Sequence, residues 1–232
     1  MFFHSEMLKY YGLIRGASRG TDPGKEDDMP LHRLKPILYV AIAAILLIQS
    51  ARAEPVEPVA VVEKLHDKLI SVMQQAKELG YAGRREALTP ILLASYDLAR
   101  MARVTVGRHW KEMNDGQKDL LIEAFTAMTL SNYASRFNGF SGEYFETLGT
   151  IETPQGHTIV QTHIVTSDEK IRIDYLMRKS DDGWKIIDVF LKGTISELAA
   201  RHSEYMTVIR DRGIDALIDA VREKAASLAE MR

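Results

Sequence analysis

The histidines are the first side chains to consider for catalysis or for a metal site. After residue 53 they are His66, His109, His157, His163 and His202. A helical zinc pair needs two histidines on one helix face, as in His-x3-His or His-Glu-x-x-His. None of the five has a partner at that spacing. We therefore interpret them as solvated or hydrogen-bonded histidines and expect no metal site.

Two aspartates are the remaining candidates for acid–base chemistry. Asp174 or Asp188 can act as a base inside an apolar pocket, with Tyr175 as a hydrogen-bond donor. In the other interpretation Asp174 shares the solvent face with Arg172, and Asp188 caps or hydrogen-bonds a neighbouring backbone group, because acids in strands are usually paired or solvated. After residue 53 the chain has no Gly-x-Ser-x-Gly elbow, phosphate loop or Gly-x-Gly-x-x-Gly. These patterns favour a protein that is not an enzyme.

The complete absence of cysteine narrows the chemistry further. It excludes disulfides, thiolate metal sites and a cysteine nucleophile. A domain of this size can do without disulfides because its hydrophobic core suffices. An exported chain without thiols fits a bacterial periplasm better than a eukaryotic secreted module.

An apolar run near the start of the chain predicts export. Residues 37–48 are all apolar, follow a basic stretch at residues 32–35 and lead into Ala-Arg-Ala at residues 51–53. This order is typical of a secretory signal peptide, here residues 29–53 with cleavage after Ala53. The run is shorter than the ~20 apolar residues of a spanning helix. An uncleaved membrane anchor stays open as the alternative.

Residues 1–28 fit neither interpretation, because they carry acids where a signal peptide has basic residues. We expect translation to start at Met29 and interpret residues 1–28 as an upstream extension that is not translated or is disordered. Residues 54–232 then form a single domain, since 179 residues suit one core. This domain has 23 Lys and Arg against 27 Asp and Glu, a net charge of −4, with both signs mixed. That balance argues against nucleic acid as a partner.

Hydrophobic periodicity predicts helices around a central sheet. A helix should run from about residue 59 to Gly80, and two shorter helices, 84–93 and 96–104, should be separated by Pro90. Asn114 and Gln117 have the spacing of a capping box, so a longer helix should follow as far as residue 137. Four strands should occupy residues 144–191, joined by three tight turns.

The chain after the strands should return to helix. Thr194 and Glu197 have the spacing of a second capping box, Gly213 should end that helix, and a final helix should cover residues 214–228. The predicted fold is α+β: a four-stranded antiparallel meander covered on one face by several helices. Such a layout either fills its own core or leaves a hollow for an apolar ligand between sheet and helices.

Several segments, in order and spacing, resemble one family over about residues 96–223. They are Gly107-Arg-His-Trp110, Gln117, the helix of Phe125, Asn132-Tyr-Ala134, Asp174-Tyr175, Gly183-Trp-Lys185, Ile187-Asp-Val189, Gly193-x-x-Ser196, Arg201, Ile209, Gly213 and Asp215-x-Leu217-Ile218. The chain is similar to the MlaC family of periplasmic lipid-binding proteins, also called toluene-tolerance auxiliary components. It departs from the family pattern at Lys192 and in the position of Ser196, and this makes the hopanoid-associated HpnM branch an alternative.

The resemblance implies a monomeric periplasmic shuttle that holds lipid tails between sheet and helices. It also implies partners: an inner-membrane ABC transporter with its substrate-binding ring and an outer-membrane lipoprotein complex. The cargo would be phospholipid or hopanoid, with no other cofactor. Each buried CH₂ contributes ~0.8 kcal/mol, so such binding needs no catalytic group. We expect the pocket to be lined by Phe125, Met128, Tyr133, Ile173, Tyr175, Ile187, Val189, Leu198 and Tyr205.

Two other classes of function stay open at this point. One is a pocket enzyme of steroid-isomerase-like shape acting on an apolar substrate, with the aspartates and Tyr175 as its reactive groups. The other is a scaffold that only contacts membrane-protein partners. A cavity smaller than roughly 300 Å³ would indicate the scaffold.

Overall fold

The computed structural model describes residues 57–230. The predicted signal peptide (29–53) and upstream extension (1–28) lie outside these residues, and both stay predictions. Within residues 57–230, every helix is too short or too polar to traverse a lipid bilayer.

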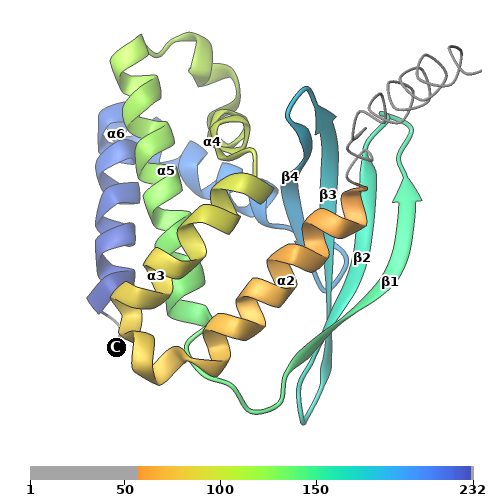
Figure 1. Ribbon diagram of the computed structural model, residues 1–232. Helices are drawn as coiled ribbons and strands as arrows, with labels where there is room; N and C mark the ends of the chain where they lie inside the picture. Colours follow the sequence, from red (N-terminus) through yellow and green to blue (C-terminus); the bar gives the residue numbers. More distant parts are fainter. Residues whose placement is uncertain (1–56, 231–232) are drawn as a thin grey trace, which may run out of the picture. The chain divides into compact units, whose positions relative to one another are not determined.

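Helices and strands are segregated along the chain. The first block is helical, the second is a sheet, and a long helix closes the chain (Figure 1). The elements are α2 (Pro58–Gln74), α3 (Ala76–Ser95), α4 (Leu98–Val106), the 3-10 helix η2 (Gly107–Lys111), α5 (Asp115–Arg136), β1 (Tyr144–Glu152), β2 (Thr158–Val165), β3 (Lys170–Ser180), β4 (Gly183–Leu191), β5 (Ile195–Ser196) and α6 (Glu197–Glu230).

The sheet is antiparallel throughout, in the order β1-β2-β3-β4-β5. The predicted four-stranded meander is confirmed, and β5 is an addition. Its two residues pair with the end of β4, and they are too few to show a period in the sequence. On the inner face, Val160 of β2 is opposite Tyr175 of β3, which in turn is opposite Val189 of β4.

The core lies between this inner face and the helices. Figure 1 shows α2 running obliquely across the strands, and it packs against β1, β2 and β4. Val62, Leu65 and Leu69 of α2 are buried, as are Tyr175 and Met177 of β3. The helices cover one face of the sheet, so the predicted α+β class is confirmed.

Helix α5 begins as the sequence predicts. The Gln117 backbone N–H donates to Asn114 Oδ1 at 2.9 Å, and the Asn114 N–H donates to Gln117 Oε1 at 3.2 Å. These two bonds form the capping box. The predicted break at Pro90 is wrong, because α3 continues through it to Ser95. Pro90 is exposed, so the carbonyl that loses its helical partner there faces water.

The start of α6 also differs from the prediction. Ser196, not Thr194, caps the helix: its Oγ accepts from the Ala199 N–H at 2.9 Å. Pairing of β5 with β4 keeps the chain extended up to Ser196, so Thr194 is too early to cap. Gly213 interrupts α6 with φ 87°, as predicted, a conformation that glycine adopts without steric cost. Gly80 interrupts α3 in the same way with φ 58°.

Candidate functional site

A cavity lies between the inner face of the sheet and the helices. Its volume is about 120 Å³. Side chains from widely separated parts of the chain meet in it, and most of them are apolar or aromatic. The lining consists of Tyr96, Met101, Phe125, Thr129, Asn132, Tyr133, Arg136, Phe137, Ile173, Tyr175, Val189, Leu191, Glu197, Leu198 and Arg201.

The structure brings six of the nine predicted pocket residues to this cavity. They are Phe125, Tyr133, Ile173, Tyr175, Val189 and Leu198. Strand alternation explains the three sheet residues, since the register places Ile173 opposite Leu191 and Tyr175 opposite Val189 on one face. Their role in binding a lipid stays a prediction.

The other three predicted residues do not line the cavity. Met128 and Tyr205 are buried against each other, with Tyr205 Oη donating to Met128 Sδ at 3.8 Å. Ile187 lines a separate groove outside this cavity, together with Leu176 and His202. The register of β3 and β4 shifts between Leu176 and Met177, so Ile187 is the unpaired residue of a bulge and does not share a face with Val189.

Sequence reasoning missed several lining residues. Phe137 caps α5 four residues after Tyr133; the predicted apolar stripe of this helix includes it, but the predicted pocket does not. Tyr96 was predicted to start a helix, whereas it is an extended residue that bridges to Ile186 of β4. No local pattern reveals that bridge, since it joins residues ninety positions apart.

Three aromatic residues form one wall of the cavity. The hydroxyls of Tyr96 and Tyr133 are hydrogen-bonded to each other, and their rings meet edge to face at 6.0 Å. The ring of Tyr133 stacks on Phe137 at 5.5 Å. Burial raises the pKa of Tyr133 to about 12 and raises the pKa of Tyr96 well above its ordinary value. Both hydroxyls are therefore neutral at physiological pH and act as hydrogen-bonding groups, not as nucleophiles.

Tyr175 connects the cavity to α2. Its hydroxyl is 3.0 Å from Nε2 of His66, and the His66 ring stacks on Phe145 with the ring centres 3.7 Å apart. Burial lowers the pKa of His66 to about 3, so the imidazole is neutral at physiological pH. A neutral ring with so low a proton affinity is a poor general base. The arrangement joins α2, β1 and β3 behind the cavity.

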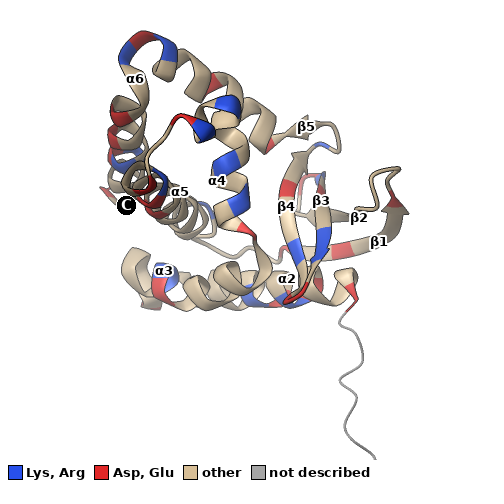
Figure 2. Ribbon diagram, turned by 90° about the horizontal axis from the view of Figure 1, so that it is seen from above, with Lys and Arg blue, Asp and Glu red and all other residues tan. Residues whose placement is uncertain are grey.

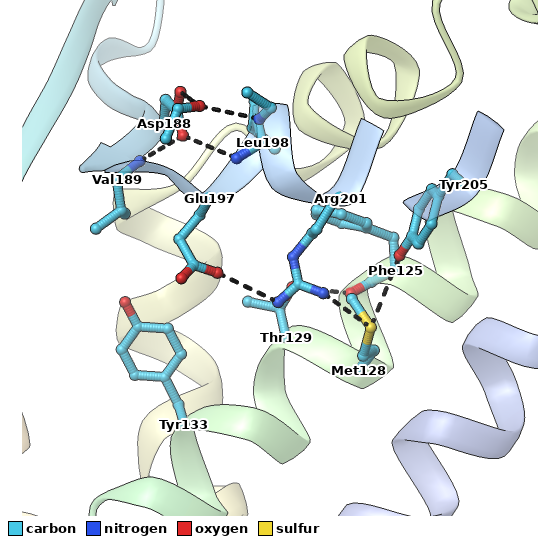
Figure 3. Close-up of polar contacts among 12 residues, drawn as sticks. Phe125, Met128, Thr129, Tyr133, Asp188, Val189, Glu197, Leu198, Arg201 and Tyr205 are labelled. Atoms are coloured by element: carbon cyan, nitrogen blue, oxygen red, sulfur yellow. Dashed lines mark hydrogen bonds and ion pairs between the residues drawn. The ribbon is translucent and has the colours of Figure 1, made fainter. Parts of the chain in front are cut away.

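A charged pair from α6 also lies on the lining. Glu197 and Arg201 are one helical turn apart, and the distance from Glu197 Oε2 to Arg201 Nη2 is 3.7 Å (Figure 3). Arg201 Nη1 also donates to Met128 Sδ at 3.4 Å. The cavity therefore has an apolar interior with charged groups in its wall, a combination suited to an amphipathic ligand.

Neither candidate aspartate faces the cavity. Asp174 is buried and accepts from Arg172 Nε at 3.0 Å. Asp188 accepts from Ser196 Oγ at 2.5 Å and from the backbone N–H groups of Val189 and Leu198 at 2.8 and 3.1 Å (Figure 3). The predicted backbone bonding of Asp188 is thus confirmed. Asp174 lies beside Arg172, but the predicted solvent-facing position is wrong, because Asp174 is only 4% exposed. Neither aspartate of the pocket-enzyme alternative is therefore placed to act as a base at this cavity, and the carboxylate that does line it, Glu197, is paired with Arg201.

The histidines likewise form no metal site within residues 57–230. No three histidine or acidic side chains of that stretch gather closely enough to hold a metal ion. His202 Nδ1 is 2.9 Å from the Thr105 carbonyl, and His109 Nδ1 is 2.6 Å from Glu112. These two are hydrogen-bonded histidines, as predicted.

Comparisons with known proteins agree with this architecture. A solved structure of a phospholipid-binding protein from Ralstonia solanacearum, in complex with a phospholipid, superposes with a TM-score of 0.66. It is 18% identical in sequence, and the match covers 73% of this chain and 97% of that one. At that identity the likeness shows the shared fold. A search of curated proteins finds no match.

The family assignment comes from the sequence profile described as MlaC protein. It matches residues 63–223, which is more than half of the chain and includes all the elements that form the cavity wall. The chain therefore belongs to the MlaC family.

Proposed function

We propose that this protein is a periplasmic carrier that binds a lipid in the cavity between sheet and helices and passes it between the inner and outer membranes. The observation that carries the proposal is the mixed lining of the cavity: side chains such as Phe125, Ile173 and Val189 make its interior apolar, while Arg136 and the Glu197–Arg201 pair add charged groups. Lipid tails gain ~0.8 kcal/mol for each CH₂ removed from water, and guanidinium groups pair with phosphate. No reaction is required of any residue.

Family membership supports the transport role, and the fold shared with a phospholipid-bound protein supports the cargo class. We propose phospholipid as the cargo, with hopanoid as the alternative suggested by the divergent segment from Lys192 to Ser196. The proposed partners are an inner-membrane ABC transporter with its substrate-binding ring and an outer-membrane lipoprotein complex. The proposed export signal at residues 29–53 would bring the protein to the periplasm.

The size of the cavity sets a condition on this proposal. Ligand pockets usually have roughly 300–1,000 Å³, and 120 Å³ is well below that range. A diacyl lipid therefore requires the walls to move apart. The half-buried lining residues, which are the ones with most room to move, lie on both walls: Ile173, Val189 and Leu191 on the sheet, and Tyr133 and Phe137 beside α5.

Lipid extraction tests the carrier function directly. Protein purified from the exported compartment should contain lipid, detected by native mass spectrometry and by mass spectrometry of a solvent extract. The extract also distinguishes phospholipid from hopanoid. Protein that is purified empty and also takes up no lipid from vesicles would contradict the proposal.

A cavity-filling variant makes the test specific for the site. Val189→Trp places an indole in the cavity and should lower the lipid content of the purified protein several-fold. Ile151→Trp is the matched control, since it adds the same ring to an exposed position on β1. Thermal unfolding of both variants checks that they are folded. Equal lipid content in the two variants would show that lipid does not bind in this cavity.

The small volume favours a second candidate, a scaffold that only contacts membrane-protein partners. Under this alternative the Val189→Trp variant should keep full transport activity in cells, because no cargo enters the cavity. A carrier should lose activity with this substitution. A transport assay comparing Val189→Trp with Ile151→Trp therefore distinguishes the two functions.

A further inference from the structure

The outer face of α4 and η2 carries positive charge without acidic residues. Between residues 98 and 111 the chain has Arg100, Arg103, Arg108 and Lys111 and no Asp or Glu. Figure 2 shows basic bands along α4, separated by uncharged ribbon. All four residues are exposed, and no carboxylate within residues 57–230 forms an ion pair with any of them. We call these four residues the α4 basic surface.

The acids that flank this surface bond to other groups. Asp97 lies just before α4, where it accepts from the Arg100 N–H at 3.1 Å and pairs with Arg178 at 3.3 Å. Glu112 lies just after η2 and is 2.6 Å from Nδ1 of His109. The charge of the α4 basic surface is thus free to act on an external anion.

Two grooves extend this surface, and His202 lines both: one lies between α4, the start of α6 and strands β3 and β4, and the other lies between η2 and α6. Arg100 and Val104 line one groove, and Arg108 lines the other together with Arg210, whose Nε donates to Asp211 at 2.9 Å. Arginine side chains bind phosphate in a bidentate manner, and long flexible side chains beside a groove can adapt to several headgroups at once. The chemistry of the surface matches an array of phosphate groups.

The α4 basic surface is also linked to the proposed cargo cavity. Met101, on the inner side of α4, lines the cavity, whereas Arg100, Arg103 and Val104 share its outer side. Leu198 of α6 lines both the cavity and one of the grooves. An object bound to the outer side of α4 is therefore one helix thickness from the cargo.

We propose that the α4 basic surface docks the protein onto the phosphate headgroups of an anionic lipid bilayer. Val104 is 45% exposed and is the single large apolar residue exposed within residues 98–111. A protein interface of ordinary strength needs a cluster of exposed apolar or aromatic anchors, and within residues 98–111 Val104 stands alone in that role. Clustered bases around one small apolar side chain fit a bilayer surface better.

The proposal rests on the carrier function, which gives docking its purpose, but the two are tested separately. The assay is flotation of the purified protein with vesicles of phosphatidylcholine alone or of phosphatidylcholine mixed with phosphatidylglycerol. Wild-type protein should bind the mixed vesicles, bind the neutral vesicles far less, and lose binding as salt is raised. Each base near such a surface contributes about fivefold in affinity, the equivalent of ~1 kcal/mol.

The test variant is Arg100→Gln with Arg103→Gln, which should weaken binding to the mixed vesicles about 25-fold. Glutamine keeps the helix propensity of arginine, so α4 should stay folded. The matched control is Lys77→Gln with Lys224→Gln, which removes two exposed charges from α3 and from the far end of α6 and should bind like the wild type. Circular dichroism melting checks the fold of both variants.

Three results would overturn the proposal. They are equal binding of wild-type protein to neutral and mixed vesicles, equal loss in the two double variants, and no vesicle binding at all. The last result would indicate an acidic protein as the partner of this surface. Lipid extracted from the same preparations reports on the carrier function independently, because it depends on the cavity and not on docking.

Discussion

His66 should make the stability of the protein fall steeply in mild acid. Its ring is buried between α2 and the sheet, and that burial lowers its pKa to about 3 from the ordinary 6.5. In the unfolded chain the ring recovers its ordinary pKa. Between pH 6.5 and pH 3 the unfolded state therefore binds a proton that the folded state does not. The folding free energy therefore has its full value, as far as His66 is concerned, above pH 6.5 and decreases as the pH falls below it.

The size of the effect follows from the two pKa values. Each pH unit inside this window costs about 1.4 kcal/mol of folding free energy. Lowering the pH from 7 to 5 crosses about 1.5 units of the window, so His66 alone should cost about 2 kcal/mol. A domain with a typical stability of about 5–15 kcal/mol would lose a measurable part of it.

Urea unfolding at pH 7 and pH 5 measures this loss. His66→Phe keeps the stacking on Phe145 and removes the titrating group, so its loss between the two pH values should be about 2 kcal/mol smaller than that of the wild type. Tyr175→Phe is the control: it removes the hydrogen bond of His66 but leaves the ring buried. Because burial is the cause of the shift, this variant should keep the full pH dependence.

The reasoning fails if His66→Phe and the wild type lose equal stability between pH 7 and pH 5. It also fails if the His66 ring protons titrate near pH 6.5 in NMR spectra of the folded protein. In that case the ring would be accessible to water in solution, and the contact between α2 and β3 would be looser than in this structure.

Three further substitutions test the packing around the cavity. Phe125→Ala should lower the unfolding free energy by about 3–5 kcal/mol in urea titrations, because the ring is fully buried. Asp188→Asn should cost about 1–3 kcal/mol, since its carboxylate accepts three hydrogen bonds, and should leave the extracted lipid unchanged because Asp188 is not at the cavity. Gly107→Ala should cost about 1–3 kcal/mol in thermal unfolding, because φ is 54° there and a Cβ would lie 3.1 Å from His202 Cε1.

The features that sequence reasoning predicted well are those decided by neighbouring residues. The capping box of Asn114 and Gln117 spans four residues, and the turns of the meander are similarly local. Strand alternation then placed Ile173 and Tyr175 correctly on the inner face. Each of these patterns depends on a backbone period that a short segment already contains.

The features that were mispredicted depend on distant partners. Thr194 and Ser196 are both plausible caps, and pairing of β5 with β4 decides between them. Ile187 was assigned to the cavity by simple alternation, but the shifted register with β3 turns it away. Met128 lies on the predicted helix, one residue from the cavity-lining Thr129, but packs against Tyr205 instead.

The sequence by itself determined the family, the succession of a helical block, a four-stranded meander and closing helices, and the apolar residues available for an inner face. Only the tertiary structure decided where that face leaves a cavity, how small it is, and that α4 presents cavity lining on one side and free arginines on the other. The reason is physical: periodicity defines the faces of one element, whereas a cavity or a charged surface is defined by which faces meet and which are left to solvent.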